Sequence, residues 1–163
     1  MYRNVFSGVT LVADHFPREV TGNFMGKPLI SLLENYFLAH SASSHSLSWG
    51  EGIKEEFRQA RGVVPFLLHI EEGYDPEVAD EVENLNRAGA LAENTVLVGG
   101  QALSDSDLDL IATKKASLIF CLSSSQSMFK KAPPLKKILE YGIKTTFGTD
   151  GVSTGGLNLF EEL

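Results

Sequence analysis

Short apolar runs alternate along this chain with segments of helical periodicity, and this alternation is the feature that most constrains its fold. Six runs of four to six residues are rich in Val, Ile, Leu, Thr and Phe, as buried strands are; they span residues 9–13, 36–39, 63–68, 95–98, 117–121 and 144–147. A loop or a helical pattern follows each run. We therefore expect an α/β fold in which about six mainly parallel strands are joined by right-handed crossovers.

Helix signals lie between these runs. Ser104 and Asp107 have the spacing of a capping box, and so do Ser48 and Glu51, which precede a helix expected to end at Gly62. Proline at a first helical position or leucines at helical spacing predict three more helices, over residues 28–35, 75–87 and 133–142. Pro65 argues against a central place in the sheet for the run 63–68.

Composition narrows the classes of function. With 163 residues, 43% hydrophobic and 21% charged, the chain (1–163) is expected to be a single globular domain. No stretch approaches the ~20 apolar residues of a membrane span, the first ten residues do not resemble a signal peptide, and the single cysteine, Cys121, has no internal disulfide partner. We therefore expect a cytoplasmic protein that does not insert into membranes.

The net charge of −7, without a basic cluster interleaved with aromatic residues, argues against a nucleic-acid partner. A small molecule or another protein is the expected partner.

Polar residues gather where the apolar runs end, which is where ligands bind in parallel α/β folds. These residues are Asp14, His15, His40, His69, Glu72, Cys121 and Asp150. Imidazole and carboxylate groups are suitable ligands for Zn²⁺ or a similar ion, and a carboxylate nearby can move a proton to or from metal-bound water. His69, Asp150 and Glu72 are candidates for these roles. Because a catalytic zinc usually has three protein ligands, at least one ligand is still unidentified.

Two segments resemble motifs of the metal-dependent amidohydrolase superfamily, in the branch of cytosine deaminase, guanine deaminase and triazine chlorohydrolases. LLHIEEG is similar to the fifth-strand motif, a resemblance that implies a metal ligand at His69 and a proton-shuttling acid at Glu72. FGTDG is similar to the eighth-strand motif, which implies that Asp150 contacts the metal and the nucleophilic water. GVTLVADH and IFCLSSS resemble the second and seventh strands. The resemblance implies the second to eighth strand region of a TIM-type (β/α) barrel.

The chain also departs from the family pattern. No His-x-His occurs anywhere, although the family carries one on its first strand, and Gly99 stands where the sixth strand ends in histidine. Leu122 and Ser125 replace the frequent Pro and Asn of the seventh-strand segment. The 163 residues also fall short of the roughly 200–250 of a closed barrel. We expect a partial barrel with an incomplete site.

Two functions therefore stay open. The first is a metal-dependent (Zn or Fe) hydrolase of C–N (non-peptide) or related bonds in a small, heterocyclic substrate. His69 and Asp150 would bind the metal, and Glu72 and Asp150 would be catalytic. Missing ligands would come from an N-terminal segment, another subunit, or residues such as Asp14, His15 or His40.

The second is a non-catalytic fragment or degenerate relative that acts through assembly or ligand binding. Its open sheet edges would favour a homo-oligomer. Under either hypothesis, His15, His40 and His45 are expected to be structural or loop residues more often than ligands.

Overall fold

A five-stranded parallel sheet is the main unit of the chain. The computed structural model describes residues 2–13, 30–42, 52–151 and 153–163. The strands run in the order β3-β4-β5-β6-β7, and they span Phe37–Ser41, Phe66–Ile70, Thr95–Gly99, Ser117–Phe120 and Lys144–Phe147. Every pairing in this sheet is parallel, so consecutive strands lie side by side and point the same way. The expected α/β fold is confirmed.

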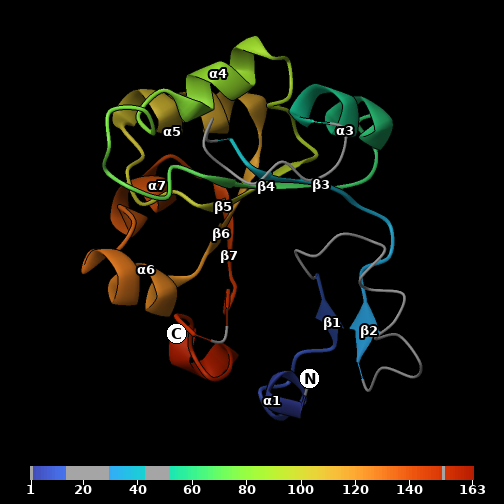
Figure 1. Ribbon diagram of the computed structural model, residues 1–163, viewed down its shortest axis with the longest axis vertical. Coiled ribbons are helices and arrows are strands. Elements are labelled where there is room, and N and C mark those ends of the chain that lie inside the picture. Colours follow the sequence, from blue (N-terminus) through green and yellow to red (C-terminus); the bar gives the residue numbers. More distant parts are fainter. Residues whose placement is uncertain (1, 14–29, 43–51, 152) are drawn as a thin grey trace.

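Helices cover one side of this curved sheet, as in the outer layer of a (β/α) barrel (Figure 1). They are α3 (Ile53–Ala60), α4 (Glu81–Arg87), α5 (Asp105–Lys114), α6 (Leu122–Phe129) and α7 (Leu135–Glu140). A short 3-10 helix, η1 (Leu159–Glu162), contacts α6. The sheet does not close on itself within the described residues, because β3 and β7 form its two edges.

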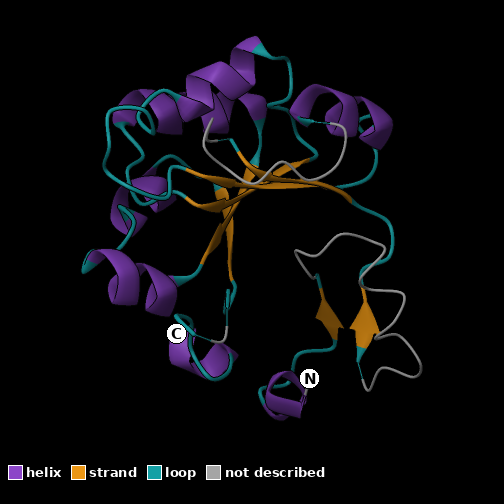
Figure 2. Cartoon of the chain, viewed as in Figure 1, coloured by secondary structure: helices purple, strands orange, loops and turns teal. Residues whose placement is uncertain are grey.

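A separate pair of short strands lies away from the main sheet (Figure 2). In it, β1 (Leu11–Val12) pairs in parallel with β2 (Ser31–Leu32), and a short helix α1 (Tyr2–Phe6) precedes β1. None of the helices in the described segments is long and apolar enough to cross a membrane.

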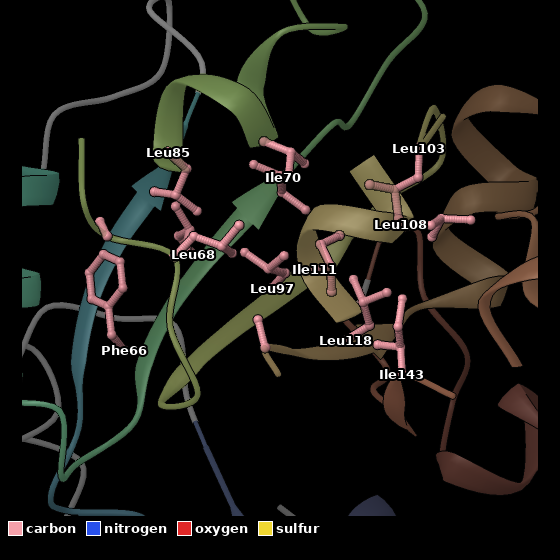
Figure 3. Close-up of a cluster of buried hydrophobic side chains, with 14 of the residues drawn as sticks. Phe66, Leu68, Ile70, Leu85, Leu97, Leu103, Leu108, Ile111, Leu118 and Ile143 are labelled. Atoms are coloured by element: carbon pink, nitrogen blue, oxygen red, sulfur yellow. The ribbon is translucent and has the colours of Figure 1, made fainter. Parts of the chain in front are cut away.

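The core lies between the sheet and its helices. Leu68, Leu97 and Leu118, from three successive strands, are fully buried. Figure 3 shows them beside the helical side chains Leu85 and Ile111. Burying one such side chain contributes about 1.5–3 kcal/mol, so this layer holds the strands in fixed register and fixes where their ends lie.

Local sequence signals explain α5 well. The Ser104 hydroxyl accepts a hydrogen bond from the Asp107 backbone N–H, and the Asp107 carboxylate accepts one from the Ser104 backbone N–H at 2.9 Å. The helix ends at Lys115, whose φ of 58° lies in the left-handed region. The predicted capping box is confirmed.

Other predicted helices were wrong in part. A helix was predicted over residues 28–35, but the described residues of this range include strand β2 instead. The spacing of the leucines fits a strand as well as a helix, and pairing with β1 favours the strand. Helix α4 begins at Glu81 instead of after Asp75; turns precede it, with Val78 N–H bonded to the Asp75 carbonyl and Glu81 N–H to the Val78 carbonyl. Ser48 and Glu51 lie outside the described residues, and α3 begins after Gly52.

The remaining differences concern single positions and one missed helix. Leu139, a leucine of the predicted helix 133–142, is 59% exposed and does not contribute to the core. Pro65 lies just before β4, where it removes no hydrogen bond from the ladder, so β4 is central after all. Helix α6 was not predicted, because its serine-rich sequence has no strong helical periodicity.

Candidate active site

The carboxyl ends of the parallel strands place the predicted site residues at one edge of the sheet. His69 lies near the end of β4, and Glu72 follows two residues after that strand. Asp150 follows β7 by three residues. The His69 Nδ1 and Glu72 Oε1 atoms are 2.5 Å apart. The structure therefore brings His69 and Glu72 into direct contact, and the Asp150 carboxylate is close enough to act on the charge of His69.

The His69 ring is shielded from solvent, with only 12% of its side chain exposed. Burial disfavours the imidazolium, but the hydrogen bond and charge of Glu72, together with the charge of Asp150, outweigh it and leave the pKa of His69 above its ordinary value. The His69–Glu72 pair can therefore hold a proton between an imidazole and a carboxylate.

A sharp turn after β4 directs Glu72 back toward His69. Glu71 has a φ of 47°, and its backbone N–H donates to Glu81 Oε2 at 2.6 Å. The side chain of Glu72 is 38% exposed, so one face of its carboxylate contacts His69 while solvent or a ligand can reach the rest. This combination suits a group that exchanges protons with a substrate.

Asp150 is held by a residue that the sequence did not single out. The buried Ser124 hydroxyl, on α6, donates a hydrogen bond to Asp150 Oδ2 at 2.6 Å, and lies 3.1 Å from the Thr154 hydroxyl. Asp150 itself has a φ of 52° and an exposed side chain. The run of serines after β6 was the only signal for Ser124 in the sequence.

His40 lies next to the pair, although its role was left open. Its ring centroid is 6.0 Å from that of His69. Burial and the neighbouring His69 lower the pKa of His40, while the charge of Glu72 acts in the opposite direction. His40 therefore favours the neutral form beside His69. Three other candidates, Asp14, His15 and His45, lie outside the described residues.

Cys121 is buried near the same edge. Burial, together with the charges of Asp150, Glu162 and Glu72, raises the pKa of its thiol to about 12. The thiol therefore stays protonated, and Cys121 packs as a small buried hydrophobic residue.

The described part of the chain does not supply a full set of metal ligands. No group of three or more His, Cys, Asp or Glu side chains in it could hold a metal ion. Position 99, where the family resemblance places a histidine, is a buried glycine. These residues on their own do not fit a catalytic zinc, which usually needs three protein ligands.

Comparison with known proteins supports the resemblance to the amidohydrolase superfamily. No protein-family model matches the chain. It is 27% identical over 156 residues to the 5-methylthioadenosine/S-adenosylhomocysteine deaminase of Halothermothrix orenii, covering 94% of this chain and 31% of that protein. It is 30% identical over 130 residues to the protein of the same name from Halobacterium salinarum, covering 73% of this chain and 30% of that one. The chain thus spans about a third of the length of the curated relatives it matches.

Solved structures show the same fold. A zinc-bound adenosine deaminase from Xanthomonas campestris matches with a TM-score of 0.64 and 22% identity, over 88% of this chain and 34% of that one. A triazine hydrolase variant matches with a TM-score of 0.69 and 15% identity, over 82% of this chain and 30% of that one. Fold and relatives together define part of a TIM-type (β/α) barrel. The chain belongs to the metal-dependent amidohydrolase superfamily, as the two motifs predicted.

Proposed function

We propose that the chain forms part of a hydrolase that cleaves C–N bonds in a small heterocyclic substrate. The observation that carries this proposal is the contact of His69 with Glu72, at the sheet edge where Asp150 also lies. The names of the relatives, 5-methylthioadenosine/S-adenosylhomocysteine deaminase, make aminopurine nucleosides the first substrate class to test. Such a reaction replaces an exocyclic amino group by oxygen from water and releases ammonia.

Glu72 is the proposed catalytic acid and base. Its carboxylate contacts His69 through Oε1, and the rest of the group is accessible to a ligand at the sheet edge. It can therefore take a proton from the attacking water and deliver it to the leaving nitrogen, while the charge of His69 adjusts to each state. Asp150, held by Ser124, would accept a hydrogen bond from the water and orient it toward the substrate.

A divalent metal, Zn or Fe, is the proposed cofactor, and His69 and Asp150 are its proposed ligands. The related structures include proteins with bound zinc. Because the residues described for this chain do not complete a ligand set, the remaining donors would come from outside these residues or from another chain.

The proposal is tested by ammonia release. The purified chain, loaded with zinc or iron, is incubated with 5-methylthioadenosine and, in parallel, with an aminotriazine. We expect turnover of at least one of the two. Asp150→Asn should lower the rate about 100-fold or more, the range of a group that positions a reactant. Asp109→Asn, on an exposed face of α5, is the matched control and should keep the wild-type rate. No ammonia from either substrate would contradict the proposal.

A second candidate function is ligand binding without turnover by a degenerate member of the superfamily. The glycine at position 99 and the lack of a three-ligand group within the described segments favour it. Calorimetry with 5-methylthioadenosine separates the two candidates, since this function predicts binding heat without ammonia release.

A further inference from the structure

Gly99 lies against the proposed catalytic group. It is the last residue of β5, it pairs with Ile70 of β4, and it is buried. Its φ of 100° falls in a region that residues with a side chain rarely adopt. Only glycine can therefore occupy position 99 without backbone strain. Its missing side chain leaves space beside β4.

Glu72 fills that space. A Cβ atom built at position 99 would lie 2.9 Å from Glu72 Cγ and 3.1 Å from Glu72 Oε1. The same Oε1 atom is 2.5 Å from His69 Nδ1. Any side chain at position 99 would therefore press on the one oxygen that joins Glu72 to His69.

The backbone around Gly99 leaves little room for adjustment. The built Cβ would also lie 3.1 Å from the Ile70 carbonyl oxygen, and that oxygen already accepts a 2.8 Å hydrogen bond from Gly100 N–H. Gln101 N–H bonds to the Glu71 carbonyl at 3.2 Å, which continues the pairing past the strand ends. Since the two backbones are fixed to each other, the flexible Glu72 side chain is the part that would have to move.

We infer that Gly99 is a positioning residue whose missing side chain lets Glu72 fold back over β5 and reach His69. This inference rests on the proposed role of Glu72 in proton transfer. A side chain at position 99 and the present conformation of Glu72 would occupy the same space.

The test compares G99A, E72A and the double variant E72A/G99A with the wild-type chain. G142A is the matched control, because Gly142 also has a positive φ, 68°, but a Cβ there would meet nothing within 4 Å. The first readout is the Nδ1 signal of His69 in a long-range ¹H–¹⁵N spectrum, assigned with H69A. We expect G99A and E72A to move this signal away from its wild-type position and G142A to leave it unchanged.

An unchanged His69 signal in folded G99A would overturn the inference. If G99A does not fold, the double variant decides, because removal of the Glu72 side chain removes the collision. A folded E72A/G99A supports the inference, and an unfolded one overturns it, since the backbone conformation of residue 99 or the Ile70 carbonyl, and not Glu72, would then be the obstacle. Neither readout needs a substrate. Failure of the proposed function would instead appear as absent ammonia release by the wild-type chain.

Discussion

Glu71 is a carboxylic acid in a buried environment that disfavours its charged form. Its side chain is fully buried, and among the described residues only the Val82 backbone N–H is near enough to favour its charged form. Burial, with the nearby charges of Asp107 and Glu81, raises the pKa of Glu71 to about 8. Glu71 is therefore mainly protonated at neutral pH.

Glu71 should make stability depend on pH. Because its folded pKa lies above its ordinary value of 4.5, stability is greatest below that value and is lost as pH rises through about 8. In urea unfolding, the free energy of unfolding of the wild type should fall by up to a few kcal/mol relative to that of Glu71→Gln between about pH 5 and about pH 9. Parallel pH profiles for the two proteins would contradict this account.

The elements differ in how far the sequence could predict them. Helix α5 was predictable because its capping box lies within four consecutive residues, Ser104 to Asp107. Helix α6 was not, because its place depends on contacts with η1 that join distant parts of the chain. The site residues also differ in how far the sequence could predict them. A contiguous motif revealed His69 and Glu72, whereas His40 and Ser124 reach the site only through strand pairing and helix packing.

The capping box predicts a local stability effect. Ser104→Ala should cost about 1 kcal/mol in the free energy of unfolding, because the first turn of α5 would lose a hydrogen-bond acceptor. Ser127→Ala, at an exposed position within α6, is the control and should change the unfolding free energy by less than about 0.5 kcal/mol. Equal effects of the two substitutions in urea unfolding would show that the cap contributes nothing.

At the scale of the whole molecule, the open sheet is the feature that needs an explanation. Strands β3 and β7 each pair with only one neighbour within the described residues. Free strand edges offer hydrogen-bonding groups to another chain. Apolar side chains near the carboxyl end, Phe160 and Leu163, are 65% and 81% exposed.

These edges predict self-association. Light scattering of the purified chain should give a mass that is a multiple of 17.8 kDa. Thr145→Pro, on the edge strand β7, removes a backbone N–H that points away from β6, because N–H groups alternate in direction along the strand and that of Gly148 bonds to the Phe120 carbonyl. This substitution should weaken the association if this edge mediates it. Ala132→Pro is the control for proline at an exposed loop position away from β7. A monomeric mass across the whole concentration range would contradict the prediction.

The most direct test of the proposed function compares ammonia release from 5-methylthioadenosine by the wild-type chain and by Glu72→Gln. Glu83→Gln, on α4 and paired with Arg87, serves as the control for a neutralised glutamate. We predict that Glu72→Gln lowers the rate about 100-fold or more while Glu83→Gln keeps it, because Glu72 contacts His69 at the sheet edge and Glu83 pairs with Arg87 on α4. A wild-type rate in Glu72→Gln, or no ammonia from the wild type, would contradict the assignment of this site.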